Sequence, residues 1–195
     1  MKRLIPVNNG GGIDFEPVFK RLNEELSKVG QLLGLICAGG YVMQLHGYKS
    51  TVDVDAFFRS NTIIETIIRN VGDEFGINPH DELWLNGSIS NMNPEPPDKY
   101  CELVHSFSNL VVKAVNIIYL IGMKFKSGRE QDLKDLGDII KQENNEKPFE
   151  LLSELAGMGF DIDISGLLDA FESAHGMDWL DEFYIKNQDK LRKYF

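Results

Sequence analysis

The sequence has few cysteines and no long apolar run. Its 195 residues include two cysteines, Cys37 and Cys101, too few for the disulfide framework of a small secreted domain. No apolar stretch approaches the roughly 20 residues that a membrane-spanning helix needs. We therefore expect a cytoplasmic protein that has no membrane partner.

Basic residues are outnumbered by acidic ones. The chain has 20 Lys and Arg against 30 Asp and Glu, which gives a formal net charge of −10. Proteins that grip long nucleic acids usually present a basic face, because neutralising phosphates supplies much of their affinity. The balance disfavours extended nucleic-acid binding and leaves a nucleotide, a protein partner or an RNA end as expected partners.

The spacing of apolar residues predicts a mixed α/β (α+β) fold. Spacings typical of helices cover four long segments: 14–30, 61–71, 117–128 and 131–142. A shorter helix is expected at 41–46, and strands are expected at 32–38, 51–58, 101–107 and 109–115. The segment 75–93 is rich in turn residues, and we expect Trp84 to plug the core beneath it. Together these elements predict a small mixed β-sheet flanked by helices.

The composition changes near residue 144. Residues 144–195 hold eleven acidic and five basic residues, and their apolar spacing predicts three short helices, at 149–157, 164–173 and 179–193. Asp161 and Asp163 stand just before the second of these helices and are expected to cap it. We predict one domain at 1–143 and an acidic helical C-terminal appendage at 144–195.

A glycine pair and an acid pair lie close together in the first half of the chain. The apolar run 32–38 ends at Gly39 and Gly40, and Asp53 and Asp55 follow in the predicted strand 51–58. Residues two apart in a strand point to the same face, so the carboxylates would repel each other unless a divalent cation lay between them. A glycine turn before a helix lets the backbone approach a phosphate. The alternative is an edge strand with a solvated acidic face.

These residues also carry a resemblance to a known family. Gly39-Gly40, Lys49-Ser50-Thr51 and Asp53-x-Asp55 resemble the signature of the nucleotidyltransferase superfamily that includes DNA polymerase beta. The similarity is greatest to a small bacterial branch with abortive-infection type IV toxins and related uncharacterised nucleotidyltransferases. The resemblance implies a nucleotidyltransferase fold and a nucleoside triphosphate as substrate. It also implies two Mg²⁺ ions on Asp53 and Asp55, with the glycines beside the triphosphate. Lys49 stands where the family usually has Arg, which keeps the charge but loses the bidentate fork.

A second motif follows in the helical segment 117–142. The pattern of Lys124, Lys126, Arg129, Asp132 and Asp135 is similar to another hallmark of the abortive-infection branch. That resemblance implies that Lys124 faces nucleotide phosphates and that Asp132 and Asp135 support the site. Without the resemblance, the same charges are typical of a solvated helix face.

The third carboxylate of the superfamily is missing from its usual strand. Family enzymes supply it from a later strand, where this chain has Lys113, and Glu102 on the preceding strand is the nearest substitute. Three alternatives follow: Glu102 acts, the acceptor supplies its own base, or the chain binds nucleotide without transferring it. The expected function is therefore transfer of a nucleoside monophosphate to a protein or RNA hydroxyl, as in toxin–antitoxin relatives. The alternative is a catalytically inactive module that holds a protein partner.

Overall fold

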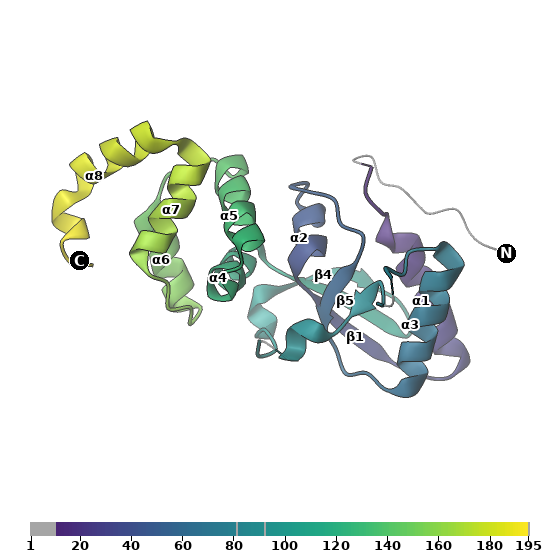
Figure 1. Cartoon of the computed structure of the whole chain (residues 1–195). Helices are drawn as coiled ribbons and strands as arrows, with labels where there is room; N and C mark the ends of the chain where they lie inside the picture. Colours follow the sequence, from purple (N-terminus) through teal and green to yellow (C-terminus); the bar gives the residue numbers. More distant parts are fainter. Residues whose placement is uncertain (1–10, 81, 92, 195) are drawn as a thin grey trace. The chain divides into compact units, whose positions relative to one another are not determined.

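The chain folds into two compact units. The structure, a computed structural model, describes residues 11–80, 82–91 and 93–194, and the units divide between Ile117 and Ile118 (Figure 1). The division falls before the boundary at 143/144 that composition predicts. The reason is packing: α5 (Glu130–Gln142) lies against α7 (Ile164–His175) of the acidic segment. The charge composition changes near residue 144, but the hydrophobic core of the C-terminal unit includes helices on both sides of that position.

Within its described residues, the N-terminal unit holds a mixed sheet of five short strands in the order β3-β2-β1-β5-β4. Strand β1 pairs in parallel with β5 and antiparallel with β2, while β4 pairs antiparallel with β5 and β3 pairs in parallel with β2. This confirms the predicted mixed sheet. The elements are α1 (Phe15–Lys28), β1 (Leu33–Cys37), α2 (Gly39–Leu45), β2 (Val54–Phe57), α3 (Thr62–Phe75), β3 (Leu85–Asn86), β4 (Cys101–Ser106) and β5 (Leu110–Val115), with 3-10 turns at Ser88–Asn91 and Asp98–Tyr100.

Helices α1 and α3 lie together beside the sheet (Figure 1). The sheet face toward α1 carries buried side chains from alternate positions of three strands: Leu33, Leu35, Val54, Ala56, Leu110, Val112 and Ala114. Trp84 is fully buried. Its ring lies 5.9 Å from that of Phe15, and its Nε1 donates a hydrogen bond of 2.9 Å to the Ile68 carbonyl of α3. The prediction that Trp84 plugs the core is confirmed.

Local signals fix the ends of both helices. The Asp14 side chain accepts a hydrogen bond of 3.1 Å from the amide of Glu16 at the start of α1. Asn61 accepts one of 2.9 Å from the amide of Ile64 at the start of α3, and Gly76 ends that helix with φ of +70°. These contacts satisfy terminal backbone groups that a helix leaves unpaired.

The C-terminal unit is helical in its described residues. It contains α4 (Ile117–Ser127), α5, α6 (Pro148–Gly157), α7 and α8 (Met177–Leu191). Gly128, with φ of +62°, separates α4 from α5, where the sequence predicts a break. Asp163 occupies the predicted N-cap position of α7, but its side chain accepts from the Ser165 hydroxyl and makes no capping hydrogen bond with a backbone amide of the helix. Within the described part of the chain, no helix is both long and apolar enough to span a membrane.

Candidate metal and nucleotide site

Two glycines let α2 approach the acidic segment very closely. Gly39 has φ of +59°, and a Cβ at this position would lie 2.8 Å from Asp55 Oδ2. A Cβ at Gly40 would lie 2.6 Å from Thr51 Oγ1. Real Cβ atoms essentially never come so near another heavy atom, so larger residues would have to push these side chains away. The glycine pair therefore places the start of α2 directly against Asp55 and Thr51.

Side-chain hydrogen bonds fix the loop that carries Asp53. Thr51 Oγ1 donates to Asp53 Oδ1 over 2.9 Å, and the Thr51 amide donates to Gln44 Oε1 of α2 over 3.0 Å. Gln44 also donates from Nε2 to the carbonyl of Ile13 over 2.8 Å. Strand β2 therefore begins at Val54, later than the predicted strand 51–58, because these side chains hold Thr51 and Asp53 in a loop.

Asp53 and Asp55 thus flank the same glycine turn. Asp55 lies against Gly39, and Asp53 is bonded to the threonine that lies against Gly40. Both acids are half-buried, and the Ala38 amide donates to the Asp55 carbonyl over 2.9 Å. This arrangement joins the glycine and acid motifs, which are separated by about a dozen residues in sequence. Lys49 is exposed on the loop between α2 and β2.

The sheet register assigns Glu102 and Lys113 to opposite faces. Glu102 pairs with Ala114, which pairs with Cys37, and Cys37 pairs with Ala56. Paired residues point to the same face, so Glu102 lies on the face opposite to Asp55. Lys113 pairs with Ile36, which pairs with Phe57, and so shares the face of Asp55. Lys113 is therefore a cation on the same sheet face as Asp55.

A further carboxylate reaches that face from outside the sheet. Asp98, on the 3-10 turn Asp98–Tyr100, forms an ion pair with the Lys113 ammonium, and its side chain is largely exposed. Hydrogen bonding to Asp98 raises the pKa of Lys113. Sequence reasoning missed this acid because it lies in a loop without periodicity. Its only signal was the preceding proline-rich segment, which gives no register.

The second predicted motif forms a buried ionic cluster in the C-terminal unit. Lys124 Nζ donates to Asp132 Oδ1 over 2.8 Å and to Asp135 Oδ2 over 2.6 Å. Lys124 and Asp132 are each 5% exposed and Asp135 is 1% exposed. The cluster joins α4 to α5 across the break at Gly128. These contacts give the three residues a structural role, while contact between Lys124 and phosphate remains a prediction from the resemblance.

Asp132 is held in its charged form by several donors. Burial alone would raise its pKa, but hydrogen bonds from Lys124, Ser127 and Arg129 lower the pKa to about 2. The bond from Arg129 Nε is 2.7 Å long. Asp135 also accepts a bond of 3.0 Å from Gln131 Nε2. Because the carboxylates are so extensively hydrogen-bonded, the buried charges are compensated.

The donor chemistry of the acid pair suits magnesium. No group of three or more His, Cys, Asp or Glu side chains that could hold a metal occurs among the described residues. Magnesium, however, is commonly bound through one or two carboxylates, with substrate phosphates and water completing its shell. Asp53 and Asp55 offer the hard oxygen ligands of such a site. In their donor chemistry, Asp53 and Asp55 therefore fit a magnesium ion.

Comparison of the chain with protein-family models, with curated proteins and with solved structures found no match.

Replacing Lys124 by Met tests the ionic cluster. We expect Lys124→Met to lower the free energy of unfolding at neutral pH by about 3 to 5 kcal/mol, since it leaves two buried carboxylates without their ammonium. Urea unfolding followed by circular dichroism measures the change. Lys126→Met, which removes an exposed lysine from the same helix, is the matched control and should have little effect.

The effect of Lys124→Met should depend on pH. The pKa of Asp132 is lowered to about 2 in the folded chain, against about 3.9 when unfolded. This stabilisation is therefore present above about pH 4 and is lost as the pH falls toward 2. The difference between wild type and Lys124→Met should shrink over that interval. A difference independent of pH, or equal losses for Lys124→Met and Lys126→Met, would contradict the assignment.

Proposed function

We propose that the N-terminal unit binds a nucleoside triphosphate with Mg²⁺ at the Gly39-Gly40 turn. We further propose that it transfers the nucleoside monophosphate to a hydroxyl of a protein partner or an RNA end. The observation that supports this most directly is that Asp53 and Asp55 flank the glycine turn. The resemblance to nucleotidyltransferases, including those of toxin–antitoxin systems, rests on the same residues.

Each residue of the site would have its own role in binding and transfer. Asp53 and Asp55 would hold the metal, which neutralises phosphate charge when bound. Thr51 orients Asp53 through its hydrogen bond of 2.9 Å. Gly39 and Gly40 let the triphosphate approach the backbone, where a side chain would exclude it. Catalysis would consist mostly of positioning and charge compensation, as in phosphoryl transfer generally.

The reaction is a substitution at the α phosphorus. The acceptor hydroxyl oxygen forms a bond to the α phosphorus, and the bond from that phosphorus to the bridging oxygen breaks. Pyrophosphate leaves with the electron pair of the broken bond. The hydroxyl proton passes to a base, so the identity of that base decides whether the chain catalyses transfer or only binds nucleotide.

Removing both carboxylate charges tests the site. We expect Asp53→Asn with Asp55→Asn to abolish magnesium-dependent nucleotide binding, measured by calorimetric titration with each of the four ribonucleoside triphosphates. The fold should remain as stable as in wild type or become slightly more stable, because two neighbouring like charges are removed.

The second Asp-x-Asp sequence provides the matched control for this double variant. Asp161 and Asp163 precede α7 in the C-terminal unit, and their replacement by Asn should leave nucleotide affinity unchanged. Unchanged affinity in the Asp53/Asp55 variant, or an equal loss in both double variants, would contradict the site.

We propose Asp98 as the base of the N-terminal unit in place of Glu102. Asp98 contacts Lys113 on the face of Asp55, whereas the register assigns Glu102 to the opposite face. The ion pair with Lys113 would have to open for Asp98 to accept the hydroxyl proton. A nucleotide or acceptor phosphate that draws Lys113 away would allow this step.

The two acids can be distinguished by comparing binding with transfer. We expect Asp98→Asn to slow pyrophosphate release by about a hundredfold or more, as for the loss of a general base. Magnesium-dependent nucleotide affinity should not change. Glu102→Gln is the matched control and should retain wild-type rates in the same assay, with cell extract as the source of acceptor. A slower rate in Glu102→Gln alone would restore Glu102 to the role.

Lys113 favours a second function, which is nucleotide binding without transfer. Lys113 lies on the face of Asp55, where superfamily enzymes usually have a carboxylate. A chain with this replacement would bind nucleotide and act on a protein partner without transfer. Magnesium-dependent binding without pyrophosphate release, in the presence of extract, would identify this inactive module.

A further inference from the structure

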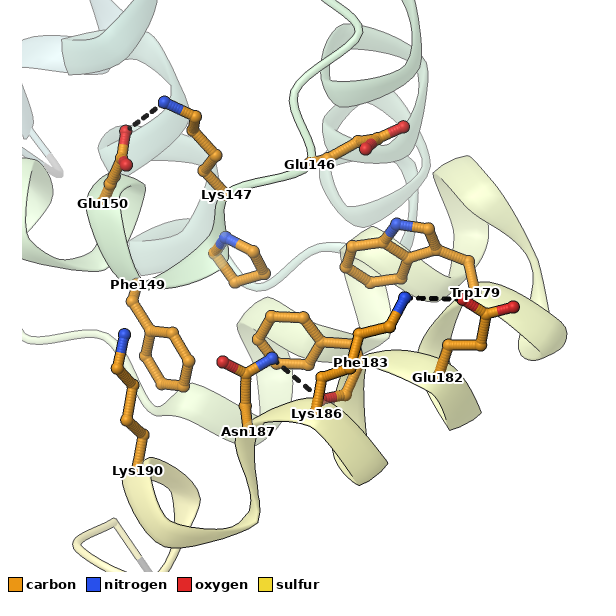
Figure 2. A pocket seen from close by; sticks show the side chains of 11 residues that line it. Glu146, Lys147, Phe149, Glu150, Trp179, Glu182, Phe183, Lys186, Asn187 and Lys190 are labelled. Carbon is orange, nitrogen blue, oxygen red and sulfur yellow. Dashed lines mark hydrogen bonds and ion pairs between the residues drawn. The ribbon is translucent and has the colours of Figure 1, made fainter.

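The C-terminal unit contains a groove that the nucleotide site does not use. Helices α6 and α8 enclose a space of about 420 Å³. Phe149 and Pro148 of α6 and Trp179 and Phe183 of α8 line it, and lysine and glutamate side chains surround it (Figure 2). A volume of this size is typical of ligand pockets, which are lined by aromatic side chains with a few polar groups.

A kink in α8 shapes one end of the groove. Asn187 has φ of −122° and ψ of 17°, which interrupts the helix. Its Nδ2 donates a hydrogen bond of 2.9 Å to the Phe183 carbonyl, which helps to satisfy a backbone acceptor at the break. Beyond the kink, the Lys190 ammonium lies 5.3 Å from the centre of the Phe149 ring and the Tyr194 ring lies 5.9 Å from it.

The aromatic lining continues into the hydrophobic core. The Phe171 ring, which is fully buried, stacks on Trp179 at 5.6 Å, and Trp179 stacks on Phe183 at 5.2 Å. Phe183 lies 5.4 Å from Phe149. Trp179, Phe183 and Phe149 remain partly exposed. A row of rings held from behind by the core offers a rigid apolar surface at low entropic cost, as in protein-binding hot spots.

The charges around the groove show which ligand fits it. Lys147 pairs with Glu150 at 2.9 Å and Lys186 pairs with Glu182 at 2.8 Å. Glu146 and Lys190 form no ion pair with any residue that the structure describes. Figure 2 shows Glu146 on the Trp179 side and Lys190 beside Phe149, at opposite ends of the groove. An apolar body with a basic group at one end and an acidic group at the other would complement both.

We propose that this groove binds a peptide segment of a partner protein, with an apolar anchor between one basic and one acidic residue. The anchor would lie against Trp179 and Phe183, the basic residue at Glu146 and the acidic residue at Lys190. Lysines and glutamates are equal in number around the groove, so a polyphosphate or RNA strand would meet as much repulsion as attraction. The proposal does not depend on the nucleotide site.

A display library of random peptides of about twelve residues, selected on the immobilised full chain, tests this proposal. We expect enrichment of peptides that carry an aromatic or large aliphatic residue between opposite charges. The most enriched peptide, made with a fluorescent label, then gives dissociation constants by anisotropy. Phe183→Ala and Lys190→Glu should each weaken binding by about tenfold or more, as expected for a central anchor and its flanking charge.

Two matched variants and a charge reversal complete the test. Ile185→Ser removes an apolar side chain of α8 that is 70% exposed and outside the groove, and Arg192→Glu reverses an exposed charge near Lys190. Both should bind as wild type does. A peptide whose acidic residue is replaced by Lys should recover affinity for Lys190→Glu.

Three results would overturn the proposal. The first is enrichment no greater than on the bare support. The second is peptide binding that is insensitive to Lys190→Glu and Glu146→Lys, both of which change exposed side chains. The third is a single-stranded RNA or ATP whose binding is weakened by Phe183→Ala, when binding of the selected peptide is not weakened.

Discussion

The candidate site depends on the missing side chains at Gly39 and Gly40. Their hydrogen atoms allow the first turn of α2 to lie so close to Asp55 and Thr51 that a Cβ would have to push those side chains away. Thr51 then holds Asp53 by a hydrogen bond, and Gln44 holds Thr51 from within the same helix. These contacts therefore connect the glycine turn and the short helix α2 to both Asp53 and Asp55.

Charge has a different use in each unit. In the N-terminal unit, Asp53 and Asp55 remain half-buried beside a turn that a phosphate could approach. In the C-terminal unit, buried Lys124 donates to two buried carboxylates in a contact between two helices, where these hydrogen bonds compensate its charge. The first arrangement suits binding, and the second suits a fixed helix pair. The aromatic groove of α6 and α8 adds a separate surface. Glu146 and Lys190 at its two ends form no ion pair within the described part of the chain, which favours a ligand with charges of both signs.

The sequence predicted those elements whose apolar spacing is strong. Helices α1 and α3 and strands β1 and β5 were found with small errors at their ends, because one face of each is buried. The later start of β2 was not predictable, since it follows from tertiary bonds to Thr51. The face of Glu102 depends on the pairing of β4 with β5, and the partners of Lys124 depend on how α4 folds back on α5. Spacing within one segment carries no information on such contacts.

The most direct test of the account is to locate where a divalent metal binds. Manganese can replace magnesium at oxygen ligands, and it broadens the NMR signals of nearby amides. Titration of the isotope-labelled full chain with Mn²⁺ and a nucleoside triphosphate should first broaden the amides of Gly39, Gly40 and residues 51–55, with excess Mg²⁺ reversing the effect. Broadening that begins in the acidic C-terminal unit, or that is uniform along the chain, would contradict the assignment of Asp53 and Asp55 as metal ligands.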